Sequence, residues 1–221
     1  MYGFDTEGKT IHYPSVNLIR RGNIVAFHDV DGEAPSIVNA SVTRTRNYLT
    51  AAEVETLMAA ARKLTRYGHR DATMILIAYR HGLRASELCD LQWHQVELNA
   101  GRLHVRRRKR GTPSVHPMQG DEIRALRRLQ REHGPSPHVF ASERGGPMSP
   151  KSFGTLFARL GERAGMAFPI HPHMLRHACG YALANAGHDT RALQAWLGHR
   201  NIQHTVRYTE LAPDRFKDFW R

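Results

Sequence analysis

The sequence predicts a mainly α-helical protein with one small antiparallel β-sheet, an α+β fold. This prediction rests on three observations. Helix-start signals occur at Thr50–Glu53 and at Ser149–Pro150, and a segment near the middle of the chain has the alternation of a β-hairpin. The 221 residues suffice for one good-sized domain with an arm, or for two small domains.

The first 45 residues differ in composition from the rest of the chain. They contain Gly, Pro, Asp and Ser, with only short apolar stretches such as Ile24–Phe27. A segment of this length is too short to form a second folded domain without help. We therefore expect residues 1–45 to be an arm or a poorly ordered extension with at most a short strand, and residues 46–221 to be the folded domain.

The first half of the expected domain begins with helices. Thr50–Glu53 has the pattern of a capping box, in which the Thr and Glu side chains satisfy free N–H groups at a helix start. A second, more apolar helix is expected over Ala72–Tyr79, and Gly82 ends it. A third is expected to begin near Ser86 and to continue through Trp93.

The middle of the chain has the pattern of a three-stranded sheet. Val96–Leu98 and Leu103–Val105 flank the turn Asn99–Gly101, which indicates a hairpin. Arg106–Thr112 would form the next turn, and Ser114–Pro117 the third strand.

The second half of the chain is expected to be helical. Ser149 precedes Pro150, the order favoured for an N-cap and a first helical residue. Helices are expected over 121–131, 149–165, 173–186, 190–197, 202–208 and 213–220.

The charge balance points to a polyanionic partner. Lys and Arg number 32 against 20 Asp and Glu, which gives a formal charge of +12 and a pI of about 10.4. Proteins this basic usually bind nucleic acid, although a basic surface kept only for solubility is the alternative.

Cysteine usage and hydropathy indicate the compartment. Cys89 and Cys179 lie in apolar runs without the spacing of a metal or redox pair, as in a reduced, cytoplasmic protein. No apolar run approaches the about 18–20 residues of a membrane span, and the N-terminus lacks a signal pattern.

The first candidate site lies in Gly82–Leu88. Arg84 follows a glycine turn at the start of a helix, where backbone N–H groups already favour an anion, and its planar guanidinium matches phosphate oxygens. Glu87 lies on the same helix face and could orient a catalytic base or Arg84 itself. The alternative is a surface Arg–Glu pair of little consequence.

Five consecutive cations occupy the second hairpin turn. We interpret four of them as a solvated turn that holds DNA phosphates without sequence specificity: Arg106, Arg107, Arg108 and Arg110. Lys109, followed by Gly111–Thr112, could reach a leaving oxygen and protonate it.

Histidines and arginines recur in the last fifty residues. His173 and Arg176 share a helical face because they are three residues apart. His171, His173 and His177 could suggest a metal site, but a fuller ligand set would be needed, so no metal is expected. His177 and Cys179 are interpreted as packed structural residues.

The last candidates follow a helix end. Gly198 has the position of a helix C-cap, so that His199 would project from the loop beyond it. Tyr208 near a helix end is, taken alone, most often a half-buried packing residue. Together with the arginines and histidines it becomes a candidate nucleophile.

Through these candidate residues the chain resembles the tyrosine recombinases of the phage integrase family, whose catalytic residues lie in short sequence motifs called boxes. The resemblance covers residues 48 to 215. Arg84 in Gly82–Leu88 resembles the first box, and Lys109 resembles the β-hairpin lysine. Four residues resemble the second box in order and spacing: His173, Arg176, His199 and Tyr208. The segments that contain these four residues are especially similar to the fimbrial phase-variation recombinases, small enzymes that invert a promoter-bearing segment.

The resemblance implies a metal-free mechanism without a cofactor. The Tyr208 hydroxyl would attack a DNA phosphodiester and form a 3′-phosphotyrosine link. Arg84 and Arg176 would stabilise the transition-state charge, and His199 would hydrogen-bond the phosphate. Further roles are implied for three residues: His173 as general acid/base, Lys109 as the acid for the leaving oxygen, and Glu87 as support.

The resemblance also implies the partners. The expected partner is double-stranded DNA, on which the protein would assemble as a homotetramer, whereas the free protein could be a monomer. No membrane partner is expected. The expected location is the cytoplasm, at the nucleoid. Three alternatives remain: a DNA-binding transcriptional regulator with a recombinase-like fold, an integrase or transposase of a mobile element, and a type IB topoisomerase. The arm at 1–45 has no counterpart that we can match, and the segment 211–221 could pack in cis or on a neighbouring protomer.

Overall fold

The computed structural model describes residues 46–108, 111–132 and 134–210, together with four short strands near the N-terminus. The chain divides into two compact units, Met1–Thr43 and Arg44–Arg221. The helix expected over 213–220 lies outside the described residues.

The described part of the first unit consists of two antiparallel strand pairs. β1 (Gly3–Phe4) pairs with β2 (Thr10–Ile11), and β3 (Leu18–Arg20) pairs with β4 (Asn23–Val25). The sequence had suggested at most one short strand here. Pairs of two or three residues give few cross-strand contacts, which is why the pattern is weak in the sequence.

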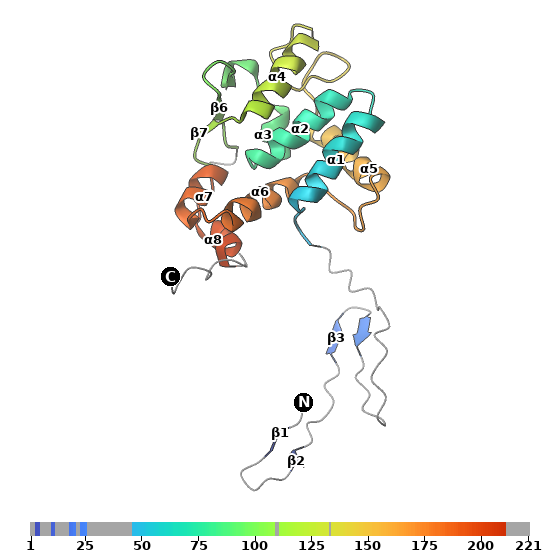
Figure 1. The fold of residues 1–221 in the computed structure, drawn as a ribbon, viewed down its shortest axis with the longest axis vertical. Coiled ribbons are helices and arrows are strands. Elements are labelled where there is room, and N and C mark those ends of the chain that lie inside the picture. Colours follow the sequence, from blue (N-terminus) through green and yellow to red (C-terminus); the bar gives the residue numbers. More distant parts are fainter. Residues whose placement is uncertain are drawn as a thin grey trace. The chain divides into compact units, whose positions relative to one another are not determined.

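The second unit is mostly helical, with a small sheet at one side (Figure 1). Its described helices are α1 (Ala51–Leu64), α2 (Gly68–Arg80), α3 (Ala85–Cys89), α4 (Gly120–Glu132), α5 (Pro150–Arg163), α6 (His173–Asn185), α7 (Thr190–Leu197) and α8 (Gln203–Glu210). The sheet has the antiparallel order β5 (Val96–Glu97), β6 (Arg102–Val105), β7 (Ser114–Pro117). This confirms the predicted fold class.

The expected caps are present. The Thr50 side chain accepts from the Glu53 backbone N–H, and the Glu53 carboxylate accepts from the Thr50 N–H, which closes the capping box of α1. Ser149 caps α5 with Pro150 in its first turn. These local signals position α1 and α5, which contact each other.

The third helix is shorter than the sequence indicated. It ends at Cys89, so the expectation that it continues through Trp93 is wrong. The Trp93 N–H bonds to the carbonyl of Pro137, and the carbonyl of Leu91 accepts from Val139. These pairings take the backbone out of the helix, and Trp93–Gln95 forms a short 3₁₀ turn, η1.

Two apolar clusters hold the second unit together. The larger one includes fully buried Leu57, Ile77 and Phe157 of α1, α2 and α5. A smaller one includes Leu197 of α7 and Tyr208 of α8. Both cysteines are buried free thiols, as expected of core residues. Of the helices described, none has the length and apolarity to cross a membrane.

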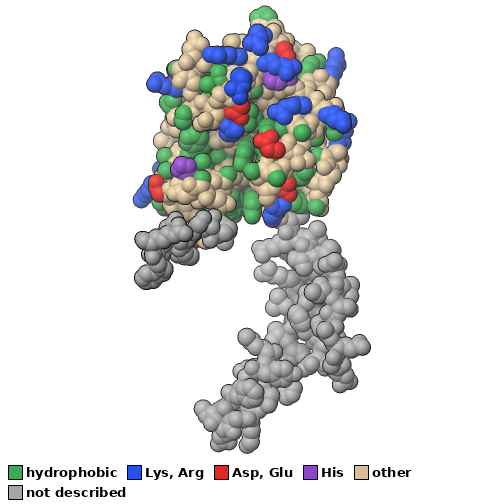
Figure 2. All heavy atoms as spheres, viewed as in Figure 1, with side chains coloured by type: hydrophobic (Ala, Val, Ile, Leu, Met, Phe, Trp, Pro, Cys, Tyr) green, Lys and Arg blue, Asp and Glu red, His purple; other side chains and the backbone are tan. Residues whose placement is uncertain are grey.

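Basic side chains are spread over the surface drawn in Figure 2, including its upper end, where Figure 1 places α4. The exposed arginines of α4 are Arg124, Arg127, Arg128 and Arg131. The positive charge seen in the composition is therefore presented to solvent, where a polyanion can meet it.

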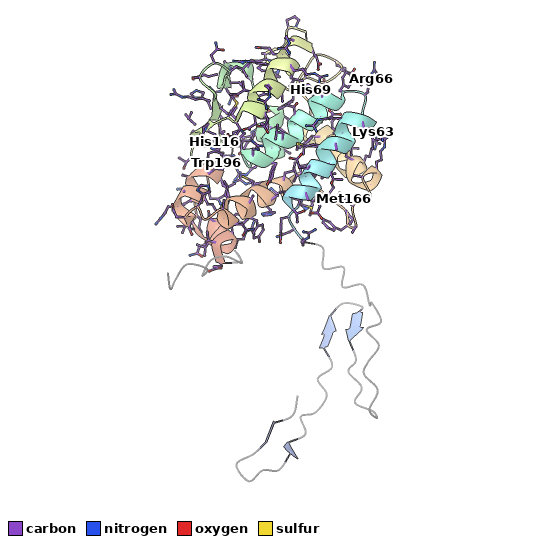
Figure 3. All side chains as sticks on the ribbon, in the orientation of Figure 1. Lys63, Arg66, His69, His116, Met166 and Trp196 are labelled. Atoms are coloured by element: carbon purple, nitrogen blue, oxygen red, sulfur yellow. The ribbon has the colours of Figure 1, made fainter. Side chains whose placement is uncertain are left out.

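A buried histidine cluster joins the sheet to three helices. His81 after α2 approaches His116 of β7, with 3.1 Å between their Nδ1 atoms, and its Nε2 lies 2.7 Å from Glu122 of α4. Trp196 of α7 stacks on His116 with ring centroids 3.8 Å apart, and Figure 3 shows the two side by side. The cluster fixes β7 and α7 against each other.

The cluster predicts an acid-sensitive fold. Burial, His81 and the charge of Arg107 lower the pKa of His116 to about 3, whereas an unfolded histidine has a pKa of about 6.5. Between these values only the unfolded state binds the proton, so stability is full above about pH 6.5 and falls as the pH drops, by up to about 1.4 kcal/mol per pH unit for this group.

The measurement is urea unfolding between pH 7 and pH 4. His116→Asn should be less stable at pH 7 but show a shallower loss toward acid. The exposed His94→Asn should keep the slope of the unmodified protein. Equal slopes for His116→Asn and the unmodified protein would contradict the assignment.

Candidate active site

Arg84 is oriented by Glu87, one of the two roles that the sequence suggested for this carboxylate. Gly82, with φ of +56°, turns the chain between α2 and α3. Arg84 then donates from Nη1 to Glu87 Oε1 at 2.6 Å, and its backbone N–H donates to Oε2 at 3.0 Å. The Glu87 side chain is buried, whereas a quarter of the Arg84 side chain is exposed. The guanidinium is thus held in place while part of it faces solvent.

Arg107 does not belong to a solvated turn, and that expectation is wrong for this residue. Its side chain is fully buried, and Nη1 donates to Glu87 Oε2 at 3.0 Å. Further donations go to the carbonyls of Gly82, His81 and Trp196. A single guanidinium therefore joins the hairpin to the Arg84 turn and to the end of α7.

The alternation of β6 contains the signal that could have identified Arg107. Leu103 and Val105 point inward, and the same period of two places Arg107 inward and Arg106 and Arg108 outward. Arg106 and Arg108 are exposed, as expected for DNA contacts. Lys109 and Arg110 lie outside the described residues.

Glu87 is ionised in this setting. Burial alone would raise the pKa of its carboxyl, but the Arg84 N–H, the charge of Arg107 and the Arg84 guanidinium together lower the pKa below its usual value. Burial lowers the pKa of Arg107, which Glu87 opposes. The two charges thus stabilise each other inside the protein.

Replacing Arg107 should destabilise the fold strongly. Arg107→Met leaves the Glu87 carboxylate buried beside one remaining cation, and breaking a buried pair costs about 3–5 kcal/mol. The matched variant Arg106→Met changes an exposed neighbour and should alter the free energy of unfolding by less than about 0.5 kcal/mol. Urea unfolding followed by circular dichroism compares them. Similar stabilities for the two variants would show that the buried pair has no such role.

Arg176 ties α6 to two of the other site segments. It is almost fully buried, and it donates from Nη1 to the Gly82 carbonyl at 2.5 Å and from Nη2 to the Leu197 carbonyl at 2.6 Å. Burial and the charges of Arg84 and Arg107 lower its pKa to about 10. Arg176 therefore lies close enough to Arg84 for the two positive charges to repel each other.

His199 follows the end of α7. Gly198 has φ of +64° and caps the helix, as predicted, and its Cα lies against the Arg107 side chain, so that a Cβ there would clash. The His199 ring is half-buried, and its Nδ1 lies 2.8 Å from Thr205 Oγ1. Burial, Arg176 and Arg84 lower the pKa of His199 to about 3, so the ring is neutral at pH 7.

Tyr208 is fully buried, more than the half-burial typical of a tyrosine at a helix end. Its ring is parallel to that of His199, with centroids 6.4 Å apart. Its face covers Gly180 of α6, where a Cβ would lie 2.8 Å from three ring carbons. The absence of a side chain at 180 makes room for the ring.

The Tyr208 hydroxyl contacts His177, a residue that the sequence had assigned to packing alone. The distance from His177 Nδ1 to Tyr208 Oη is 2.8 Å. His173, at the start of α6, is exposed, and its ring lies perpendicular to the His177 ring with centroids 4.6 Å apart. The spacing of four residues between the two histidines, which places them on one helix face, was the available signal.

Gly180 can be tested by adding one methyl group. Gly180→Ala should push the Tyr208 ring away and destabilise the protein by about 1–3 kcal/mol, because the site is already full. Gly154→Ala in α5 meets open space and should be neutral or stabilising by up to about 1 kcal/mol. Thermal unfolding of both variants tests this prediction. Equal melting temperatures for Gly180→Ala and Gly154→Ala would contradict the close packing of the Tyr208 ring on Gly180.

A basic hollow of about 690 Å³ opens beside these residues. Its lining includes Arg84, Gly111, Arg191, His199, Arg200 and His204. Arg84 and His199 therefore face one space, together with two further arginines. Within the described parts of the chain, no three His, Cys, Asp or Glu side chains are grouped to hold a metal ion.

Comparison with known families shows which family the chain belongs to. Residues 47–215 match the profile of the phage integrase family, which covers most of the chain. The chain belongs to the phage integrase family. This confirms the resemblance seen in the sequence.

Two curated relatives from Escherichia coli K12 are similar over most of their length. Type 1 fimbriae regulatory protein FimE is 45% identical over 181 residues, which are 79% of this chain and 91% of the relative. Type 1 fimbriae regulatory protein FimB is 41% identical over 187 residues, which are 82% of this chain and 93% of the relative.

Solved recombinases share the fold. The XerA recombinase superposes with a TM-score of 0.67 at 25% identity, over 78% of this chain and 63% of that one. The Tn1549 transposon integrase, solved with circular intermediate DNA, gives a TM-score of 0.65 at 25% identity, over 73% and 61%. This chain thus spans less than two thirds of those structures.

Proposed function

We propose that this protein is a site-specific tyrosine recombinase that cuts and rejoins double-stranded DNA through Tyr208. The observation that carries the proposal is the basic hollow that Arg84 and His199 line together. These two residues come from segments far apart in the sequence, and the buried Tyr208 ring lies parallel to the His199 ring. Membership of the phage integrase family and the similarity to solved recombinases support it.

The proposed reaction is a transesterification. The Tyr208 Oη bonds to phosphorus while the bond from phosphorus to the 5′ oxygen breaks, which leaves a 3′-phosphotyrosine and a 5′-hydroxyl. Arg84, Arg176 and His199 stabilise the charge on the non-bridging oxygens. Attack by a 5′-hydroxyl of the partner strand reverses the step, so the energy of the ester is retained and neither ATP nor a metal ion is required.

Protons move on both sides of the phosphorus. Lys109 protonates the leaving 5′ oxygen, and His173 acts as general acid/base near the tyrosine. The pKa of His173 is lowered to about 4 by the loss of solvent on the side of its ring that faces the protein, while the other side stays exposed, and by the charges of Arg176, His171 and Arg84. A bound phosphate would counter these positive charges and raise that pKa towards the range in which a histidine exchanges protons at neutral pH.

The remaining assignments follow from the same function. Residues 46–221 form the catalytic domain and 1–45 an arm. Exposed Arg106 and Arg108, with Arg110, hold DNA phosphates. We propose a tetramer on DNA, a cytoplasmic location at the nucleoid, and, from the fimbrial relatives, inversion of a DNA segment. Short inverted repeats on both sides of a promoter would support inversion, and mobile-element ends would support integration.

A DNA-binding regulator without strand cleavage is the second candidate. The names of the two relatives, which describe regulatory proteins, favour it. The two functions differ at Tyr208, because a regulator needs no nucleophile.

Tyr208→Phe should abolish covalent attachment to DNA while leaving affinity nearly unchanged, because only one oxygen is removed. The assay uses a nicked substrate that traps the covalent complex, with EDTA present, and detects protein–DNA products on a denaturing gel. Arg84→Ala serves as a comparison and should lower cleavage far more than affinity. A denaturant-resistant complex with Tyr208→Phe would exclude Tyr208 as the nucleophile, and its absence even with the unmodified protein would favour the regulator.

A further inference from the structure

The Tyr208 hydroxyl lies against the His177 ring, with 2.8 Å between Tyr208 Oη and His177 Nδ1. Arg207 Nη2 contacts both ring nitrogens, at 3.0 Å from Nδ1 and 3.4 Å from Nε2, and lies 3.4 Å from Oη. In the tautomer that carries its hydrogen on Nε2, Nδ1 presents its lone pair to the Tyr208 hydroxyl, which is then the donor.

The surroundings of His177 keep the ring neutral in the free protein. The side chain is only 7% exposed. The charged or titratable groups that face it are His173, His171 and Arg176 near or on its own helix, and Arg207 with Tyr208 on α8. Burial, followed by these positive neighbours, lowers its pKa to about 3. A proton acceptor must be a neutral imidazole whose nitrogen lone pair faces the hydroxyl of the nucleophile.

We propose that His177 is the general base that takes the Tyr208 proton during strand cleavage, in place of the direct transfer to His173 given above. The inference rests on the proposed function, in which Tyr208 is the nucleophile. The O–H bond breaks and the proton moves to His177 Nδ1 as Oη bonds to phosphorus. The bond to the 5′ oxygen breaks with its electron pair on that oxygen, which an acid on the opposite side protonates. On rejoining, His177 returns its proton to Tyr208.

His173 is less well placed for this step. It is exposed, and its ring contact is with the His177 ring, to which it lies perpendicular, rather than with Tyr208. The scissile phosphate would bring a negative charge to a site rich in cations. That charge favours protonation of His177, so the base becomes effective when DNA is bound.

The decisive variant is His177→Asn, in which the amide oxygen can replace Nδ1 as an acceptor but cannot take a proton. Single-turnover cleavage of the nicked substrate should slow by about 100-fold or more at pH 7. The rate should then rise steadily with pH, because hydroxide must remove the proton. His138→Asn changes a half-buried histidine on a separate segment and should keep the rate and pH profile of the unmodified protein.

Two chemical changes separate a base from a packing residue. Fluorinated tyrosine at position 208 has a more acidic phenol, which loses its proton more easily. Its introduction should therefore raise the cleavage rate of His177→Asn by a larger factor than that of the protein with His177. Sulfur in place of the leaving 5′ oxygen needs no acid, so it should rescue Lys109→Ala but not His177→Asn. Rescue of His177→Asn by sulfur, or no selective effect of fluorine, would overturn the assignment.

The tautomer can be tested without a mutation, which covers the case of a variant that does not fold. Nitrogen-15 NMR of the free protein should show His177 with hydrogen on Nε2 only, and hydrogen on Nδ1 would overturn the inference. The assignments of Tyr208 as nucleophile and of His177 as base can fail separately. If Tyr208→Phe still attached covalently to DNA, Tyr208 would not be the nucleophile. If Tyr208→Phe were inactive but His177→Asn fully active, only the assignment of the base would be wrong.

Discussion

The buried ion pair between Glu87 and Arg107 is the interaction on which the rest of the site depends. Glu87 accepts from Arg84 and Arg107 and from the Arg108 backbone N–H, at distances of 2.6–3.1 Å. Arg107 in turn bonds to carbonyls at the ends of α2 and α7. One carboxylate thus fixes the position of Arg84, which lines the basic hollow, and of the hairpin segment that carries Arg107 and Arg108.

Arg176 repeats this construction from the other side. It bonds to the Gly82 carbonyl, as Arg107 does, and to the Leu197 carbonyl at the end of α7. Both arginines use backbone carbonyls, which cannot be lost by mutation of a side chain. The turn before Arg84 and the loop before His199 are therefore held in register by two guanidinium groups rather than by apolar packing alone.

The sequence predicted the parts of this protein that depend on local rules. The Thr50 capping box, the Ser149 cap, the hairpin and the Gly198 C-cap each rest on a few neighbouring residues, and all are present. The end of α3 was missed because it depends on pairing with residues 137–139, far along the chain.

The candidate site was predictable in composition but not in geometry. The order and spacing of Arg84, Arg176 and Tyr208 mark the family. No local pattern, however, shows that Arg107 is inside while its equally charged neighbours are outside, unless the strand alternation is extended into the turn. The contact between His177 and Tyr208 joins two helices, so only the folded chain shows which histidine meets the hydroxyl.

The folded chain concentrates positive charge where its fold converges. Arg84, Arg107 and Arg176 lie close together with Glu87 as their acidic neighbour, and the charges of Arg84 and Arg107 contribute to the lowered pKa of Arg176. This repulsion opposes folding, and the charge of a phosphodiester bound there would offset part of it. Folding and DNA binding would then be coupled: a substitution that removes one of these positive charges would relieve the repulsion and also weaken the binding of the phosphodiester.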